Sequence, residues 1–160
     1  MNKEHKYQAT TTWVGHDPKT PFTYQFYDRS HGFKVDGKPS LNLSADAGFL
    51  GDEKKLNPED CLIAALSSCH MLSYLAFAAM RNVPVLSYVD HASGVMLQEG
   101  NGGRFTKVTL APTVTILNES DRDMAEALHE TANKNCFIAS SVNFPIFHRA
   151  TIRVNLNEAF

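Results

Sequence analysis

The sequence predicts an α+β protein in which antiparallel β-sheets surround one long central helix. Three observations lead to this prediction. The first third of the chain is rich in Thr, Tyr and Phe and is punctuated by turn residues. A single apolar stretch of helical length follows, between clear start and stop signals. The remainder combines strand patterns with a second, amphipathic helix, so that the expected order is β-β-β, α, β-β, α, β.

Length and composition limit the possible organisation. With 160 residues, 43% hydrophobic and 20% charged, the chain can bury one sizeable core, so we expect a single domain over residues 1–160. The net charge is -2 and the basic residues are scattered, so we expect no basic surface patch that would bind a polyanion. The amino terminus lacks the apolar core of a signal peptide. We therefore expect a cytoplasmic protein with neither nucleic acid nor a membrane as partner.

The first expected elements are short strands between Tyr7 and about Ser44. The segments "GHDPKTP" and "VDGKPS" are typical of turns between such strands. The next segment, "ADAGFLGDEKK", has no clear periodicity. It is predicted to be a surface loop that leads into the helix.

The central helix has well-marked ends. Asn57 is the expected N-cap and Pro58 the first helical residue, with Glu59 next to the positive end of the helix dipole. The helix should end at about Arg81, before Asn82 and a proline. It is apolar around nearly its whole circumference, with polar interruptions that favour a buried helix over a membrane span. A chain this short has little material to cover it, which favours a homodimer.

Two long strand segments are expected after this helix, on either side of a hairpin turn in "QEGNGGR". In the second segment one face carries four alternating apolar residues, Val108, Leu110, Val114 and Ile116. Pro112 interrupts this segment and is expected at a sheet edge or a bulge.

The last expected elements are an amphipathic helix and a strand. Ser120 with Asp123 resembles a capping box for a helix that runs to about Lys134. Its inner face would carry Met124, Ala127, Leu128 and Thr131. The final strand would alternate Ile152, Val154 and Leu156 against polar residues.

The three cysteines are too few for a disulfide scaffold and lack the spacing of a zinc site. Cys69 could be a small core residue. However, it lies in "SSCH", a polar island in an apolar helix, and such an island must face a polar partner or a pocket that solvent reaches. Cys136 also has polar neighbours, near the end of the second helix. The two thiols could form a dithiol pair, and Cys61 is interpreted as a packing residue.

The stretch "NPEDCLIAALSSC" resembles the motif of the osmotically inducible protein C / organic hydroperoxide resistance (OsmC/Ohr) family. That motif is Asn-Pro-Glu-Glu, an Ala-rich helix, and a cysteine ten residues after the first Glu, the spacing of Glu59 and Cys69 here. Cys136 matches the second family cysteine, although "NCFI" departs from the Cys-Pro often found there. The succession of elements agrees over nearly the whole chain.

The resemblance implies a thiol-dependent peroxidase built as an intertwined homodimer, with its sites at the subunit interface and no cofactor. The Cys69 thiolate would attack the O–O bond of an organic hydroperoxide, release an alcohol and become a sulfenic acid. Cys136 would then close a disulfide, and an external dithiol, which in family members can be a lipoyl group, would reduce it. An apolar neighbourhood together with the resemblance predicts a preference for organic hydroperoxides over hydrogen peroxide.

The resemblance also implies an activating arginine, because a thiol with a pKa of about 8.5 needs a cation to become an anion at neutral pH. The family takes it from the amino-terminal strands and orients it with the motif glutamate. Glu59 fits the glutamate, and Arg29 is assigned by elimination because it is the only arginine before the helix. The alternative for Arg29 is a solvated strand residue paired with Asp28 or Asp36.

Helix geometry adds two expectations. Ten residues of unbroken helix put Glu59 about 15 Å along the axis from Cys69, too far to share one arginine. Either the helix is interrupted near Ser67 and Ser68 or the glutamate serves from another direction, and we expect an interruption or kink there. His70 is rotated by about 100° from the cysteine and is expected to be a satisfied core or interface histidine.

Two other functions stay open from the residues. The fold could bind an apolar ligand without catalysis, in a pocket walled by Phe22, Phe26, Tyr27, Phe33 and Phe49. Alternatively, Cys69, His70 and Cys136 could hold a metal ion, although adjacent ligands on a helix diverge and a fourth is not evident.

Overall fold

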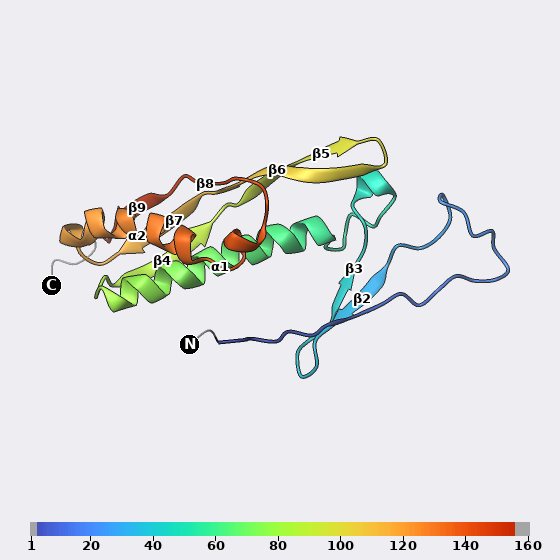
Figure 1. Cartoon of the computed structure of the whole chain (residues 1–160), viewed down its shortest axis with the longest axis horizontal. Coiled ribbons are helices and arrows are strands. Elements are labelled where there is room, and N and C mark those ends of the chain that lie inside the picture. The colour runs from blue at the N-terminus through green and yellow to red at the C-terminus, as the bar shows by residue number, and fades with distance from the viewer. Residues whose placement is uncertain (1–2, 156–160) are drawn as a thin grey trace. The chain divides into compact units, whose positions relative to one another are not determined.

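The computed structural model describes residues 3–155, and the chain divides into two compact units, Met1–Cys61 and Leu62–Phe160. Helices and strands are mixed along the chain, which confirms the predicted α+β class (Figure 1). The helix α1 (Pro58–Met80) starts at the end of the first unit and continues through the second. Each unit is described by itself.

The first unit contains a three-stranded antiparallel sheet, as the turn signals predict. Its strands are β1 (Thr10–Thr12), β2 (His31–Lys34) and β3 (Leu41–Leu43), in that spatial order. The turn between β2 and β3 closes with a hydrogen bond from the Lys38 N–H to the Val35 carbonyl, and Gly37 has a φ of 76° there, a conformation that glycine adopts without strain. The predicted loop contains one 3₁₀ turn, η1 (Ala47–Phe49).

The predicted ends of α1 are confirmed. The Asn57 side chain accepts the Asp60 N–H at 2.8 Å, and the Asp60 carboxylate accepts the Asn57 N–H at 3.1 Å, a reciprocal cap that satisfies two free donors. At the other end, Asn82 has a left-handed φ of 56° and the Val83 N–H returns to the Ala78 carbonyl at 2.9 Å.

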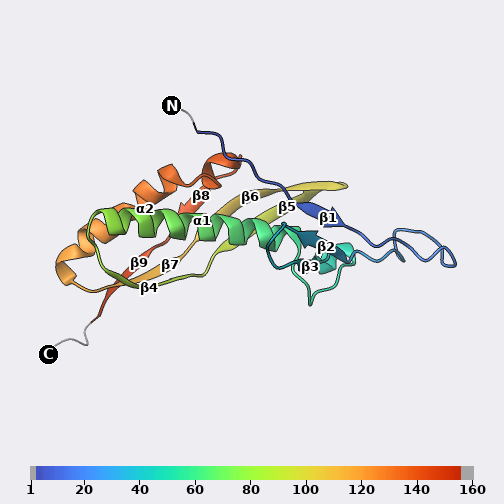
Figure 2. The same cartoon turned by 90° about the horizontal axis from the view of Figure 1, so that it is seen from below.

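The predicted interruption of α1 is wrong. The helix is continuous from Pro58 to Met80, as Figures 1 and 2 both show. Its Ser67 hydroxyl donates to the Asp90 carboxylate at 2.6 Å. The serine therefore does not compete for the helix backbone, which is the usual way a serine bends a helix.

The second unit contains two three-stranded sheets, because each predicted long strand breaks in two. The strands are β4 (Val85–Asp90), β5 (Ser93–Glu99), β6 (Gly102–Leu110), β7 (Pro112–Ile116), β8 (Ile146–His148) and β9 (Thr151–Val154). The β5–β6 hairpin turns at Gly100, as predicted. The sheet orders are β4-β7-β9 and β5-β6-β8, with β8 and β9 added in parallel. This parallel pairing differs from the expected antiparallel sheets. Leu156 lies outside the described residues.

The sheets and helices share a core. The four predicted apolar residues of β6 and β7 are buried, namely Val108, Leu110, Val114 and Ile116. They face the buried stripe of α1, which is Leu66, His70, Tyr74 and Ala78. Pro112 is the first residue of β7, the middle strand of its sheet. The edge or bulge expectation is therefore wrong, and the proline is tolerated because a first strand residue can lack its N–H bond.

The second helix, α2 (Arg122–Asn135), differs from prediction at its start and on its inner face. Ser120 lies in a 3₁₀ turn, η2 (Glu119–Asp121), and the N-cap makes no side-chain bond, so the capping box is absent. The buried residues are Ala125, Leu128, His129 and Ala132. Met124 is 41% exposed. The predicted face is rotated because a histidine takes a core position.

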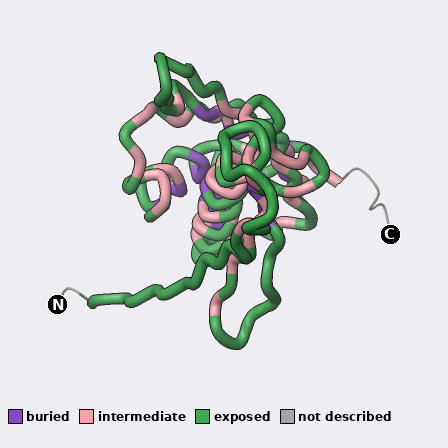
Figure 3. The backbone as a smooth tube through the Cα atoms, turned by 90° about the vertical axis from the view of Figure 1, so that its right-hand side faces the viewer, coloured by how far each residue is buried: buried purple, intermediate pink, exposed green. Residues whose placement is uncertain are grey.

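Much of α1 has an open surface. It is long and apolar enough to cross a membrane by length and composition alone, a test that core helices also pass. Yet only one stripe of it is buried, and Leu72 and Met80 are 61% and 72% exposed. Figure 3 shows the same pattern, with few buried segments among exposed and half-buried ones. A large apolar helix face is thus left uncovered by the other described elements of the second unit.

Candidate active site

The structure brings the two predicted thiols together. Cys69 is half-buried on α1, and Cys136 is the C-cap of α2 with no exposed surface. The Cys69 side chain lies close enough to Cys136 to be one of the causes that raise the pKa of the Cys136 thiol. Residues 67 positions apart in the sequence therefore form one dithiol pair, both members within the second unit.

The environment of Cys136 keeps its thiol protonated. Burial, and after it the neighbouring Cys69 side chain, raise the pKa of Cys136 to about 11. The Ala139 N–H, which donates to the Cys136 sulfur at 3.4 Å, acts in the opposite direction. At neutral pH Cys136 is thus an S–H group.

Cys69 lies at the boundary between the buried and the open face of α1. Ala65, Ser68 and Leu72 are exposed, and they lie four residues before, one before and three after the cysteine. Leu66 and His70, on its other side, are buried. Side chains three and four positions apart share a helix face, so the sulfur has the core on one side and an open helix surface on the other.

The polar residues around Cys69 face polar partners within the protein. Besides the Ser67 hydroxyl, the Asp90 carboxylate accepts the Ala111 N–H at 2.7 Å, which joins the end of β4 to the break between β6 and β7. Of the two possibilities left open by the sequence, a polar partner and a solvent-reached pocket, the first holds for Ser67 and His70.

His70 belongs to a buried imidazole cluster that the sequence did not predict. Its Nε2 lies 3.1 Å from Nδ1 of His129, and its ring centre lies 4.5 Å from that of His148. Burial lowers the pKa of His70 to about 3 and of His129 to about 4, and neighbouring imidazoles add to both shifts. All three histidines are neutral at physiological pH. The prediction of a core histidine for His70 is confirmed.

The cluster is not fully hydrogen-bonded. Within residues 3–155, four buried atoms have no partner, namely His70 Nδ1, His129 Nε2, His148 Nε2 and the Tyr88 hydroxyl. The expectation that the His70 ring nitrogens are hydrogen-bonded is therefore wrong for Nδ1. An alanine stripe in α2, Ala125 and Ala132 on either side of His129, was the available sequence signal that this histidine faces the core.

Arg29 is buried in the first unit and is held by backbone rather than by a carboxylate. Its guanidinium donates to the carbonyls of Tyr27 at 2.8 Å and Tyr24 at 2.5 Å. Its Cζ lies 4.0 and 4.9 Å from the two tyrosine ring centres, within cation–π range. The alternative of a solvated residue paired with Asp28 or Asp36 is wrong.

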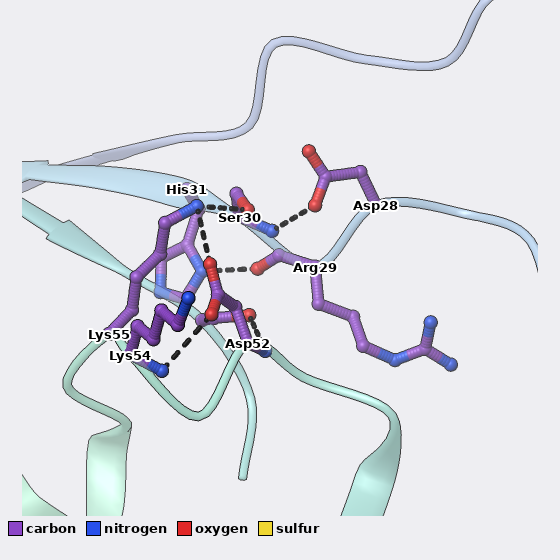
Figure 4. Close-up of polar contacts among 8 residues, drawn as sticks. Asp28, Arg29, Ser30, His31, Asp52, Lys54 and Lys55 are labelled. Carbon is purple, nitrogen blue, oxygen red and sulfur yellow. Dashed lines mark hydrogen bonds and ion pairs between the residues drawn. The ribbon is translucent and has the colours of Figure 1, made fainter. Parts of the chain in front are cut away.

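Figure 4 shows why Asp28 is not the partner. The Arg29 side chain points away from the carboxylate, which accepts the Ser30 N–H at 2.9 Å. That bond is the main cause that lowers the pKa of Asp28. Lys55 donates to the Ser30 hydroxyl at 2.7 Å and pairs with Asp52. Arg29 is thereby left outside the polar cluster, with its charge facing aromatic rings.

Arg29 lines a cavity of about 460 Å³ in the first unit. Aromatic rings of Trp13, Phe22 and Tyr27 form part of its wall, and Pro58, at the start of α1, forms another part. Of the five aromatic residues predicted for an apolar pocket, Phe22 and Tyr27 line it; Phe26, Phe33 and Phe49 do not. Trp13 was not predicted. Glu59 is half-buried beside Pro58, and no ion pair joins it to Arg29 in the described part of the chain.

The remaining alternatives find less support. Within residues 3–155, no group of three or more His, Cys, Asp or Glu side chains is arranged to hold a metal ion. Cys61 is half-buried in the first turn of α1 and is unpaired.

Comparisons with known proteins place the chain in a family. Residues 51–149 match the sequence profile of OsmC-like proteins. A solved OsmC-like protein of unknown function from Vibrio cholerae is 34% identical, with a TM-score of 0.83, and the match covers 92% of this chain and 100% of that one.

More distant structures share the fold. An organic hydroperoxide resistance protein from Elizabethkingia anophelis is 19% identical, with a TM-score of 0.70 and coverage of 97% and 100%. Another from Legionella pneumophila is 18% identical, with a TM-score of 0.65 and coverage of 94% and 98%. No match is found among curated proteins.

Proposed function

Because the chain belongs to the OsmC-like protein family, we propose that it is a thiol-dependent peroxidase that reduces organic hydroperoxides to alcohols in defence against oxidative stress. The observation that carries the proposal is the contact between Cys69 and Cys136. Two thiols on different elements, one reachable and one buried, are the arrangement that a peroxidatic and a resolving cysteine need.

The reaction would proceed in two steps on these sulfurs. The Cys69 thiolate attacks the terminal peroxide oxygen, the O–O bond breaks, and the alkoxide takes a proton to leave as an alcohol. Cys69 is now a sulfenic acid. The Cys136 sulfur attacks the Cys69 sulfur, the S–O bond breaks, and water leaves with the Cys136 proton. The closeness of the two side chains, which makes Cys69 one of the causes of the raised pKa of Cys136, supports formation of the disulfide.

Arg29 and Glu59 are the proposed activating residues, and a second copy of the chain has to complete the site. The unbroken α1 separates Glu59 from Cys69 by about 15 Å on one chain, so one guanidinium cannot contact both. In a homodimer, the thiol of one protomer can meet the arginine and glutamate of the other. The uncovered apolar face of α1 supports such an interface.

The aromatic cavity beside Arg29 supports the choice of substrate. Its apolar wall would hold the organic group of a hydroperoxide, while the guanidinium binds the peroxide oxygens. Hydrogen peroxide lacks the organic group and would gain nothing from these rings. An external dithiol, such as the lipoyl group of a lipoylated protein, would reduce the disulfide back to thiols. We place this step in the cytoplasm, where such reductants are kept reduced.

The decisive experiment compares turnover of cumene hydroperoxide and hydrogen peroxide with a dithiol reductant. The wild-type protein should prefer cumene hydroperoxide, and Cys69→Ser should lose turnover of both. Cys61→Ser is the matched control, because it removes a free cysteine of the same helix, eight positions before Cys69, and it should retain activity. Equal activity of Cys69→Ser and wild type would refute the proposal.

A second candidate, an apolar-ligand-binding protein, is favoured by the cavity alone. It predicts that cumene alcohol or a similar apolar compound binds to a wild-type protein that does not turn over peroxide. The Trp13 fluorescence would report such binding, because this ring lines the cavity.

A further inference from the structure

The two cysteines differ in their access to solvent. Cys136 has 0% of its surface exposed, whereas Cys69 is half-buried at the edge of an open helix face. We propose that the external dithiol reduces the Cys69–Cys136 disulfide by attacking the sulfur of Cys69, so that the mixed disulfide forms at Cys69 and Cys136 is the leaving group. This inference rests on the proposed function.

The direction of attack separates the two sulfurs. A thiolate displaces a sulfur along the S–S axis, from the side opposite the leaving sulfur. An attack on Cys136 would therefore have to come from the side away from Cys69, on a residue with no surface exposed to solvent. An attack on Cys69 comes from the side away from Cys136.

The backbone next to Cys136 is held by hydrogen bonds. The backbone that follows it turns into η3 (Ala139–Ser141), whose Ser140 donates to the Cys136 carbonyl from its N–H at 3.0 Å and its hydroxyl at 3.1 Å. The Ala139 N–H occupies one side of the sulfur at 3.4 Å. A dithiol cannot reach a residue with no exposed surface unless this part of the chain opens.

The path to Cys69, in contrast, is one that the reaction already requires. A hydroperoxide with an organic group has to reach this sulfur before any disulfide can form. The exposed Ser68, directly before the cysteine, marks an open side of the helix there. The same opening that admits the peroxide can admit a dithiol.

The raised pKa of the Cys136 thiol makes it a slower leaving group, but a neighbouring N–H group offsets this effect. A thiol of high pKa leaves more slowly, and burial raises the pKa of Cys136. The Ala139 N–H, however, points at its sulfur and can stabilise the departing thiolate until it takes a proton. The second thiol of the reductant then attacks the mixed disulfide, and Cys69 leaves as the thiolate that the next peroxide needs.

The test locates the first adduct on a Cys61→Ser background, which excludes the third cysteine. The protein is oxidised with one equivalent of cumene hydroperoxide, treated briefly with glutathione, quenched with acid and alkylated. Peptide mass spectrometry should find glutathione on Cys69 and the alkylating group on Cys136. Glutathione on Cys136, or equally on both, would overturn the proposal.

A second measurement excludes rearrangement of the adduct. Glutathione adducts are prepared on Cys61→Ser/Cys136→Ser and on Cys61→Ser/Cys69→Ser, and each is reduced with dihydrolipoamide. The Cys69 adduct should be released at least about tenfold faster, and equal rates would contradict the inference. A protein that cumene hydroperoxide cannot oxidise refutes the proposed peroxidase instead; the disulfide is then made with diamide and the site of attack is still measured.

Discussion

At the scale of single residues, Arg29 shows how a charged side chain can be buried without an ion pair. Two backbone carbonyls accept its N–H groups and two tyrosine rings face its charge. Only a planar group with several donors can make all these contacts at once. Because the carbonyls leave other donors of the guanidinium free, the residue can still bind a thiolate or a peroxide.

Arg29→Lys should therefore lower the rate of reaction with cumene hydroperoxide by at least about tenfold, since an ammonium group cannot replace the guanidinium fork. The measurements are the second-order rate constant and the thiolate absorbance of Cys69 as a function of pH. The fraction of thiolate at neutral pH should fall in the variant.

Arg104→Lys is the control for Arg29→Lys, because this arginine is exposed on β6. It should leave both quantities unchanged. An Arg29→Lys protein with the wild-type rate and the wild-type thiolate titration would show that Arg29 only holds its own loop together.

At the scale of elements, the imidazole cluster joins α1, α2 and β8 through neutral groups. His70, His129 and His148 come one from each element. Tyr74 stacks on His129, and Asp90 raises the pKa of His148 without overcoming the effect of burial. The buried phenols are neutral, with the pKa of Tyr74 raised to about 12 by burial. Each histidine therefore stabilises the packing only while it carries no charge.

The cluster predicts a loss of stability in weak acid. In the unfolded chain these histidines take up protons near their ordinary pKa of 6.5, whereas the folded pKa values of His70 and His129 are about 3 and about 4. Between these limits the unfolded state binds more protons, so the free energy of unfolding falls as the pH falls, by about 1.4 kcal/mol per pH unit for each proton. Above pH 6.5 the cluster adds no pH dependence.

Urea unfolding at pH 7, 6 and 5 measures this slope. His129→Gln should reduce it by about one proton, and His91→Gln is the control because that histidine is exposed. A stability that is constant between pH 7 and 5 would contradict burial of neutral imidazoles.

At the scale of the whole molecule, the sequence correctly predicted the features that depend on residues close together in the chain. The cap at Asn57, the end of α1 at Asn82 and the alternation along β6 and β7 all depend on neighbours in the sequence, and all are confirmed. The meeting of Cys69 with Cys136 was suggested only as a possibility, because periodicity does not show which elements pack together.

Other features depend on distant partners and could not be predicted. The parallel pairing of β8 and β9 with β6 and β7 is non-local. The inner face of α2 was misplaced apart from Leu128, because His129 was not expected there and has other imidazoles to pack against. The partners of Arg29 are backbone carbonyls. Because every residue has a backbone carbonyl, the residue types could not predict this pairing.

The uncovered face of α1 leads to a prediction about assembly. Leu72 and Met80 are exposed on an apolar helix with Ala76 and Ala79 between them, and contiguous apolar surface of this kind marks an interface. Wild-type protein should elute as a dimer in size-exclusion chromatography with light scattering. Leu72→Glu should be monomeric, since an unpaired carboxylate buried in an interface costs several kcal/mol, and should lose the proposed peroxidase activity if, as proposed, both protomers build the site. Leu72→Met, which keeps the apolar surface, should behave as wild type. A monomeric wild-type protein with full activity would show that one chain completes the site alone.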